Sequence, residues 1–388
     1  MNFEFHAPSA IIYGKDSSLG AASYAASLSI GKPLIVSDAF LSRSGAVARF
    51  AKNFSDMNQQ YALYAEIDNE PTVSDVENGL RAFELNKCDG VVCLGGGSAI
   101  DTAKAIAVMS ANPGSIADYM GYHKVKNPRA PLIAVPTTAG TGSEATRVVV
   151  ITDTDNDVKM MCLDNAFMPD IAIIDYGLTL SMPKNLTAYV GMDALTHAIE
   201  AYVSVKANNI SDIYALRAVE LINAGILTAY NDPSDEAARE GMMLGANMAG
   251  IAFSNASVCA VHGMSRPIGA YFHVPHGLSN AMLLPIVTEH SAGGGLRRYA
   301  EAAARMGFSP GAGDDLLARM LIDRLRHLNA ALNIPNLRGY GVDEQKFNKA
   351  IPMMVDAAIA SGSPGNNPKA FSPEEMADIY RKAYNYVS

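Results

Sequence analysis

The chain has 388 residues, of which 49% are hydrophobic and 18% are charged, a composition typical of a globular protein with a large core. A chain of this length is longer than one that usually folds around a single hydrophobic core, so we expect two domains. The net charge of −9 argues against a nucleic-acid or anionic-membrane partner. Four scattered cysteines without a CxxC pair, no signal peptide and no membrane-spanning apolar run lead us to expect a cytoplasmic protein.

The first half of the chain alternates short apolar runs with helical segments. Strands are expected at 32–38, 61–67, 89–97, 130–138 and 171–175. Between two of them, the segment 73–85 places Val76, Leu80 and Phe83 on one helix face. Unbroken apolar strands separated by helices predict a parallel sheet that is covered on both sides.

Asp38 ends the first of these strands. A carboxylate at this position is suited to accept a hydrogen bond from a ribose 2′-hydroxyl, and it would repel the 2′-phosphate of NADP. Asp38 precedes the glycine-rich turn described next, whereas the usual Rossmann order has the acid about 20 residues after the glycines. The predicted topology is therefore related to the Rossmann arrangement without being identical to it.

A glycine-rich segment, GGGSAID (95–101), follows the third strand. Its glycines permit a sharp turn and close approach of a ligand to the backbone, and Ser98 with Asp101 has the spacing of a capping box. A helix that begins behind such a turn is a ready anion site, so we expect a cofactor pyrophosphate against Gly96, Gly97 and Ser98, and we assign Asp101 to the same cofactor site. A strand–glycine–helix turn without any ligand is the alternative.

A second loop, PTTAGTGSEAT (136–146), follows the fourth strand. It has small hydroxyl side chains that suit the phosphate and ribose oxygens of a dinucleotide, namely Thr137, Thr138, Thr141 and Ser143. The alternative is a plain turn of small residues, but such a turn needs no pair of threonines followed by five other small residues.

Beyond Pro183 the pattern changes to long helices rich in Ala, Leu and Met. They are expected at 187–205, 211–230, 235–253, 297–306, 314–333 and 344–361. Strand-like alternation is nearly absent here. The sequence thus predicts a dinucleotide-binding α/β domain over 1–183 and an all-α domain over 184–388.

Four residues of the second half have the pattern of metal ligands. Asp193 and His197 lie four residues apart in GMDALTHAIE (191–200), which places them one turn apart on one helix face. His262 and His276 each precede a glycine. One carboxylate and three imidazoles suit Fe(II), Zn(II) or another first-row metal. An ordinary structural role is more common for a single histidine, but three of the eight histidines gather beside this aspartate.

Several motifs together resemble the iron-dependent (group III) alcohol dehydrogenases, the family that includes lactaldehyde reductase and propanediol dehydrogenase. They are GGGSAID, PTTAGTGSE, GMDALTHAIEAY, VHGM, PHG and NNPKAFSPEE. The resemblance runs over essentially the whole chain and implies a fold like that of dehydroquinate synthase, with an N-terminal α/β domain, an all-α C-terminal domain and a metal between them. It implies NAD and Fe(II) as cofactors, a homo-oligomer, and hydride transfer between NAD(H) and a small primary alcohol or aldehyde.

The resemblance also implies roles for individual residues. The metal ligands would be Asp193, His197, His262 and His276. The cofactor contacts would include Asp38, Asn69, Gly97, Ser98, Thr137, Thr138, Lys159 and Thr179. Phe253 would form an apolar wall beside the nicotinamide and the substrate.

The chain departs from the family pattern at Arg266, where many members have a histidine that is proposed to pass the proton between substrate and solvent. Arginine stays charged and cannot do this. His273 is a candidate substitute, and a solvated turn residue is the alternative. Arg147-Val148 replaces the apolar-then-polar pair of lactaldehyde-type members, so diol recognition is not expected to carry over.

These two arginines raise the hypothesis of a substrate that bears an anionic group. The alternative is that Arg147 and Arg266 each pair with a nearby acid, such as Glu144, or with the cofactor's phosphates. Two other functions are compatible with the fold, namely a dehydroquinate-synthase-type lyase that uses NAD and a metal, and a non-catalytic NAD-binding module. The Asp193–His197 spacing with HGM and PHG favours the dehydrogenase.

Overall fold

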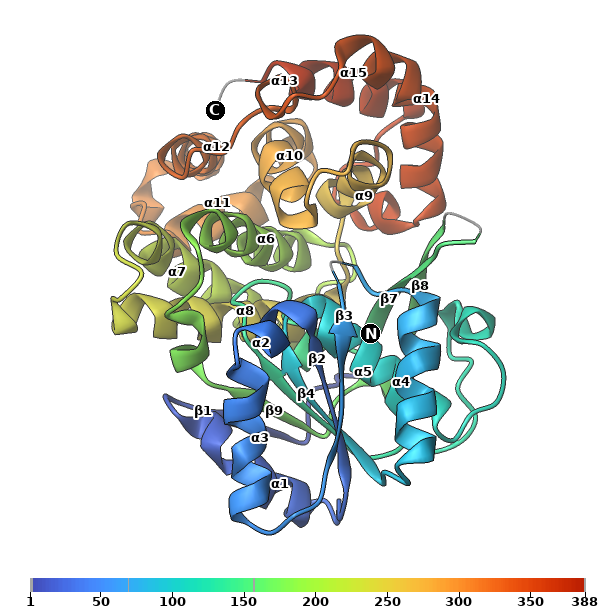
Figure 1. The fold of residues 1–388 in the computed structure, drawn as a ribbon. Coiled ribbons are helices and arrows are strands. Elements are labelled where there is room, and N and C mark those ends of the chain that lie inside the picture. Colours follow the sequence, from blue (N-terminus) through green and yellow to red (C-terminus); the bar gives the residue numbers. More distant parts are fainter. Residues whose placement is uncertain (1–2, 69, 156–157, 387–388) are drawn as a thin grey trace. The chain divides into compact units, whose positions relative to one another are not determined.

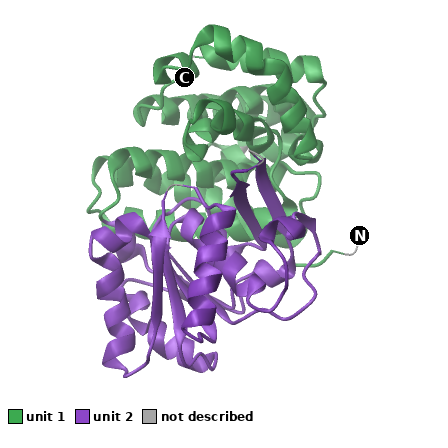
Figure 2. Ribbon diagram, turned by 45° about the vertical axis from the view of Figure 1, so that its right-hand side comes forward, with its two compact units in different colours: residues 1–5, 181–388 green, residues 6–180 purple. Residues whose placement is uncertain are grey.

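The computed structural model describes residues 3–68, 70–155 and 158–386, which divide into two compact units. Figure 2 colours these units separately: one is His6–Leu180, and the other is Ser181–Ser388 together with Met1–Phe5. The first unit contains a parallel sheet with its helices, and the second is helical. This confirms the predicted fold class.

A six-stranded parallel sheet forms the centre of the first unit (Figure 1). Its strands, in the order β1-β9-β6-β4-β2-β3, are Ala10–Tyr13, Ile171–Ile174, Leu132–Pro136, Gly90–Gly95, Pro33–Asp38 and Ala62–Ile67. Five of the six were predicted. The edge strand β1 was missed. Its four residues are apolar, but the run is short, and it alternates between half-buried and exposed positions instead of being buried throughout.

Helices cover both faces of this sheet. On one face lie α1 (Ala21–Ser27) and α3 (Ala46–Asp56), and on the other lie α4 (Val73–Leu85) and α5 (Gly97–Met109). Along β2, Leu34 and Val36 belong to the core with α4 and α5, whereas Ile35 belongs to the core with α1 and α3. Since both faces are buried, successive positions of a central strand are mostly apolar, which is why these strands were predictable.

A smaller sheet of order β5-β8-β7 completes the first unit, with strands Gly121–Tyr122, Val158–Leu163 and Val148–Asp153. The antiparallel hairpin of β7 and β8 was not predicted. In β7, Val149 and Ile151 are fully buried, while the residues on either side of them are only half-buried. These half-buried neighbours include two further valines, so the buried and the half-buried positions do not differ clearly in polarity. The exposed side of the hairpin therefore carries no polar alternation by which it could be recognised.

The second unit consists of helices joined by short turns. They are α6 (Lys184–Val203), α7 (Asn209–Asn231), α8 (Glu236–Ala256), α9 (Ala260–Phe272), α10 (His276–Ser291), α11 (Leu296–Arg305), α12 (Asp314–Ala331), α13 (Leu337–Tyr340), α14 (Glu344–Ala360) and α15 (Pro373–Tyr384). All six predicted helical segments are confirmed. Within the described ranges, no single helix is long and apolar enough to cross a membrane, and one pair, α8 with α9, passes that test only jointly and with a bend of 104°.

The helices α9, α10, α13 and α15 were not predicted. Both α9 and α10 contain a proline, at Pro267 and Pro285, although α14 was predicted despite Pro352. Pro285 has no N–H to donate to the carbonyl of Ala281, four residues earlier. Asn329 Nδ2 on α12 donates to that carbonyl instead, at 2.8 Å. A side chain from a distant helix thus allows α10 to continue through its proline.

Candidate functional site

Asp193 and His197 lie one turn apart on α6, as predicted, and both are buried. His276 reaches them because a glycine follows it. A Cβ on Gly277 would lie 2.5 Å from the backbone oxygen of Tyr189 and 3.3 Å from Asp193 Cβ. Only glycine therefore lets the first turn of α10 approach α6 so closely. His276 is the first residue of α10, and its Nε2 lies 3.7 Å from Asp193 Oδ1.

The glycine after His262 also permits a close contact. A Cβ on Gly263 would lie 2.6 Å from Pro364 Cδ, in the short helix η8 (Ser363–Asn366) that packs on α9. Asn366 Nδ2 in turn donates to Ser257 Oγ and to the carbonyl of Val258, both at 3.0 Å, in the turn that precedes α9. The late NNPKAF motif thus fixes the start of α9 and the position of His262.

The structure brings together three of the four predicted metal ligands. One ligand atom each from Asp193, His262 and His276 lies within 4.8 Å of the other two. His197 lies beside this cluster without joining it. Its ring stacks on the His262 ring, with centroids 4.3 Å apart, and on the Phe253 ring, with centroids 4.2 Å apart. Phe253 is therefore an apolar neighbour of His197.

The polar atoms of this cluster fit a bound divalent metal. Asn280 Nδ2 lies 2.6 Å from Asp193 Oδ1, 3.1 Å from His262 Nε2 and 3.2 Å from His276 Nε2. An amide nitrogen carries two hydrogens, so it cannot donate to all three acceptors at once. Within the described part of the chain, the buried atoms His197 Nδ1 and Asn280 Oδ1 have no hydrogen-bond partner. A cation with oxygen and nitrogen ligands satisfies such converging acceptors.

The electrostatics of Asp193 and His197 favour the protonation states in which these two residues bind metals, whereas at His262 burial lowers the pKa but the carboxylates of Glu200 and Asp193 outweigh burial and raise it. Burial raises the pKa of Asp193, but the three neighbouring imidazoles outweigh burial and hold the pKa of this carboxyl well below its usual range. Burial lowers the pKa of His197 to about 3. Asp193 is therefore ionised and His197 neutral at pH 7, and both offer a lone pair to a metal.

The two loops predicted to bind the cofactor contact each other at the carboxyl ends of the neighbouring strands β4 and β6. The N–H of Thr137 donates to the carbonyl of Gly95 at 3.0 Å. A Cβ on Gly97 would lie only 2.8 Å from Thr141 Cγ2, and one on Gly96 would lie 3.5 Å from Thr138 Cγ2. Gly97 is thus required by the packing of the second loop as well as being suited to close approach of a ligand.

The predicted capping box at Ser98 and Asp101 is wrong. Helix α5 begins at Gly97, its N-cap is Gly96, and no side chain caps it. The Asp101 side chain bonds other groups instead, and its Oδ2 accepts from the N–H of Val150 at 2.9 Å. The first N–H groups of α5 consequently have no capping side chain, which is the arrangement that anion sites at helix N-termini use.

Asp101 and Ser143 join α5 to the second loop. Ser143 Oγ donates to Asp101 Oδ1 at 2.5 Å and accepts from the buried Lys104 Nζ at 2.9 Å. Lys104 Nζ also donates to Thr146 Oγ1 at 2.9 Å and to the carbonyl of Val148 at 3.0 Å. Sequence analysis assigned Asp101 and Ser143 to cofactor binding, but in the structure their side chains serve contacts within the protein.

Asp38 is the last residue of β2, as the expected strand 32–38 implied. Strands β2 and β4 are neighbours, so the end of β2 lies beside the turn that follows β4. Asp38 Oδ1 accepts from the N–H of Leu41 at 2.8 Å as the N-cap of α2 (Ala39–Arg43). Asp38 Oδ2 lies 3.5 Å from the Cβ position of Gly95. One carboxylate oxygen therefore faces the glycine turn.

The other predicted cofactor contacts have partners within the protein or lie outside the description. Lys159 Nζ pairs with Glu70 Oε1 at 2.6 Å. The buried Thr179 hydroxyl donates to the carbonyl of Tyr176 at 2.8 Å. Asn69 lies outside the described residues.

The remaining predicted catalytic residues lie on or after α9. Arg266 is half-buried, and its Nη1 donates to Ser363 Oγ at 3.2 Å. After burial and the neighbouring imidazoles, its charge is a further cause of the lowered pKa of His197. His273 is an exposed residue that ends α9 in a left-handed conformation, with φ of 54°. This is the geometry of the solvated turn residue. Arg147 lies in the other unit, where its Nη1 donates to Asn165 Oδ1 at 3.0 Å.

Sequence reasoning missed two buried residues at the metal cluster, Asn280 and Glu200. Asn280 follows His276 by one helical turn, and Glu200 follows Asp193 by seven residues, so each shares a helix face with a predicted ligand. This spacing was visible in the sequence and could have identified both.

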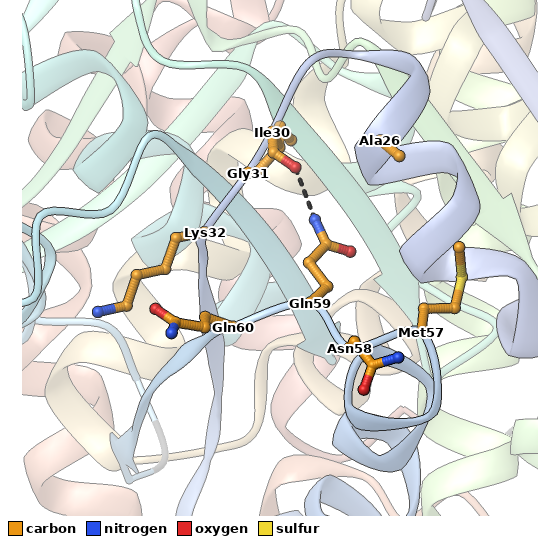
Figure 3. Close-up of a pocket in the computed structure, with 8 residues that line it drawn as sticks. All are labelled: Ala26, Ile30, Gly31, Lys32, Met57, Asn58, Gln59 and Gln60. Atoms are coloured by element: carbon orange, nitrogen blue, oxygen red, sulfur yellow. Dashed lines mark hydrogen bonds between the residues drawn. The ribbon is translucent and has the colours of Figure 1, made fainter.

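The hollow drawn in Figure 3 has no part in these sites. It is lined by Ala26, Ile30, Gly31, Lys32, Met57, Asn58, Gln59 and Gln60. These residues precede β2 and β3 and therefore lie at the amino ends of the parallel strands. Ligands of open parallel sheets bind at the carboxyl ends, where the two loops lie.

Comparisons with known proteins match both halves of the chain to the same family. Residues 8–176 match the family model for iron-containing alcohol dehydrogenase, and residues 187–384 match the C-terminal model of the Fe-containing alcohol dehydrogenase family. Alcohol dehydrogenase 4 of Saccharomyces cerevisiae is 36% identical over 385 residues, which cover 98% of each chain. Lactaldehyde reductase of Escherichia coli is 35% identical over 357 residues, which cover 91% of this chain and 92% of that protein.

Solved structures give the same result. A 1,3-propanediol oxidoreductase superposes with a TM-score of 0.95 at 33% identity, covering 99% of this chain and 100% of the other. Sulfoacetaldehyde reductase from Bifidobacterium kashiwanohense, solved in complex with NAD+, superposes with a TM-score of 0.88 at 27% identity, covering 99% of each chain.

Proposed function

Because this chain belongs to the iron-containing alcohol dehydrogenase family, it is a metal-dependent oxidoreductase of alcohols and aldehydes, and we propose that it transfers hydride between NAD(H) and a small primary alcohol or aldehyde. The observation that carries the proposal is the convergence of Asp193, His262 and His276 beside His197. The family models that match do not favour the alternative, a dehydroquinate-synthase-type lyase. A homo-oligomer and a cytoplasmic location are part of the same proposal.

We propose that Asp193, His197, His262 and His276 hold a divalent metal, iron in the first instance. When bound there, the metal supplies a Lewis acid that polarises the substrate oxygen. Phe253, which stacks on His197, presents an apolar surface that keeps water away from the reacting carbon. The domain limits 1–183 and 184–388 remain our proposal for the division between cofactor-binding and metal-binding parts.

We propose that the cofactor's pyrophosphate binds at the start of α5. The residues proposed to contact the cofactor there are Gly96, Gly97, Ser98, Thr137, Thr138 and Thr141, with Asp101 and Ser143 holding the loops together. Lys159, Thr179 and Asn69 are proposed as contacts from the family pattern alone.

We propose that Asp38 accepts from the ribose 2′-hydroxyl and so selects NAD over NADP. Relatives differ in this choice, since the Bacillus methanolicus methanol dehydrogenase is named as NAD-dependent and the Clostridium saccharobutylicum butanol dehydrogenase as NADPH-dependent. The preference of this chain therefore depends on its own residues, and the carboxylate that faces the glycine turn supports NAD.

The direct test of the proposed function is NADH or NADPH oxidation with a panel of neutral and acidic aldehydes. The protein is stripped of metal and then supplied with Fe(II) or Zn(II) without oxygen. We expect metal-dependent turnover that His262→Ala abolishes. His327→Ala, which removes an exposed histidine of α12, is the matched control and should keep full activity. Full turnover by the metal-free protein would contradict the proposal, and no net NADH formation from simple alcohols would favour the lyase.

A narrower hypothesis concerns the substrate. Arg266 lies one helical turn beyond His262 on α9, and we propose that its guanidinium favours an aldehyde with a carboxylate or similar anion. A structural relative is named as a reductase of sulfoacetaldehyde, which is such an anion. We expect wild type to prefer succinic semialdehyde to butanal in kcat/KM, and Arg266→Leu to reduce this preference at least tenfold. The hypothesis fails if wild type prefers butanal and the variant leaves the ratio unchanged.

A further inference from the structure

Glu200 is a buried carboxylate with no role in the function proposed above. It lies on α6, three residues after His197, and is 3% exposed. Its Oε2 lies 2.6 Å from His262 Nδ1, and its Oε1 accepts from the N–H of Val261 at 2.6 Å. Each carboxylate oxygen is therefore committed to one donor of the first turn of α9.

The contact with Glu200 determines which ring nitrogen of His262 has a lone pair available for a metal. Because a carboxylate only accepts, the proton of the neutral imidazole lies on Nδ1 and the lone pair lies on Nε2. His262 Nε2 is on the other side of the ring, 3.6 Å from Asp193 Oδ1 and 3.1 Å from Asn280 Nδ2. The lone pair is thus directed to the place where the other ligand atoms converge.

We propose that Glu200 is a positioning residue that fixes the ring orientation and the tautomer of His262 for metal binding. This inference rests on the proposed function, since it assumes that His262 is a ligand. A carboxylate behind a ligating imidazole also increases the electron donation of the ring to a metal, and loss of such a partner typically weakens metal binding about 10–100-fold.

The competing explanation is that Glu200 only stabilises the fold. A carboxylate next to the first N–H groups of a helix is favourable in itself, and α9 begins at Ala260. The two explanations differ in what they predict. A structural role changes the stability of the metal-free protein, whereas a positioning role changes metal affinity and the geometry of the bound metal.

Glu200→Gln separates them because an amide cannot replace both acceptors. If the amide oxygen faces the N–H of Val261, its NH2 group faces His262 Nδ1, and the ring must carry its proton on Nε2, where no metal then binds. If the amide oxygen faces His262, its NH2 group meets the N–H of Val261, and two donors oppose each other in a buried site. Either orientation disturbs His262.

The experiment measures the dissociation constants of Zn(II) and Co(II) by chelator competition, with the Co(II) absorption spectrum as a report on coordination. The full-length protein is used as wild type, Glu200→Gln and Glu301→Gln. Glu301 is the matched control, because it is a carboxylate of the same unit that bonds Tyr202 and Arg297 instead. We expect Glu200→Gln to bind both metals about 10–100-fold more weakly with an altered Co(II) spectrum, and Glu301→Gln to match wild type.

Wild-type affinity and an unchanged spectrum in Glu200→Gln would overturn the inference while leaving the proposed function intact. Failure of the wild type to bind metal at His262 would overturn both. A measurement on the wild type covers the case in which Glu200→Gln does not fold. The ring nitrogens of His262 are assigned in the metal-free, 15N-labelled protein by comparison with His262→Ala. The spectra are recorded at a pH where the ring is neutral. We expect the neutral ring to carry its proton on Nδ1, and a neutral ring with its proton on Nε2 would refute the inference.

Discussion

Gly277→Ala tests whether the close approach of α10 to α6 builds the metal cluster. The added Cβ would lie 2.5 Å from the backbone oxygen of Tyr189 and 2.9 Å from its carbonyl carbon. Backbone atoms of a buried helix pair cannot yield as a flexible side-chain tip does. The start of α10 must therefore move away by roughly 0.5–1 Å to restore an ordinary contact, and such overpacking costs about 1–3 kcal/mol.

The displacement acts directly on His276, which is the residue before Gly277. A metal site tolerates errors of only about 0.2 Å in its ligand distances, so a shift of this size should weaken metal binding at least tenfold. We expect a melting temperature lower by roughly 2–10 °C in the metal-free protein, together with the loss of affinity. Differential scanning fluorimetry and chelator competition measure the two effects.

Gly241→Ala is the matched control. Gly241 lies inside α8, and its Cβ would be 3.9 Å from the nearest neighbouring atom, the carbonyl oxygen of Leu221. We expect this variant to be as stable as wild type or up to about 1 kcal/mol more stable, with unchanged metal affinity. Wild-type metal affinity in Gly277→Ala would refute the argument that this glycine positions His276.

Two further predictions concern the first unit. Asp38→Asn keeps an N-cap acceptor for Leu41 but removes the negative charge. The ratio of kcat/KM for NADPH to that for NADH should therefore rise by about 5–150-fold, corresponding to about 1–3 kcal/mol. A wild type that already uses NADPH equally well would show that Asp38 does not select the cofactor. Burial lowers the pKa of Lys104 from 10.5 to about 8, so between pH 8 and 10.5 the unfolded chain binds a proton that the folded chain does not. The stability of wild type relative to Lys104→Met should therefore rise with pH across this window, by up to about 3 kcal/mol in urea unfolding, and a constant or falling difference would contradict the assignment.

The parts of the fold that were predictable are those whose cause is local in the sequence. Strand β2 is apolar at successive positions because Leu34 and Ile35 enter cores on opposite faces of the sheet. The helix α10 was not predicted, and the side chain that compensates for Pro285 is remote in the sequence, since Asn329 lies more than 40 residues later. Local patterns do not contain such distant partners.

The candidate site shows the same division. The spacing of Asp193 and His197 on one helix reveals a pair of ligands directly, whereas the capping role assigned to Asp101 was wrong because its partners, Ser143 and Val150, belong to a loop and a strand some 40–50 residues away. The glycines after His262 and His276 were noted in the sequence, but their purpose appears only when the packing partners Pro364 and Tyr189 are known.

The central claim is that Asp193, His197, His262 and His276 together bind the catalytic metal. Anomalous diffraction at the iron absorption edge, from crystals of protein loaded with Fe(II), tests it most directly. We predict one strong peak in each chain, about 2 Å from a carboxylate oxygen of Asp193 and from one ring nitrogen of each of the three histidines. A peak bound by other residues, or no peak in a protein that reduces aldehydes with NADH, would contradict the account.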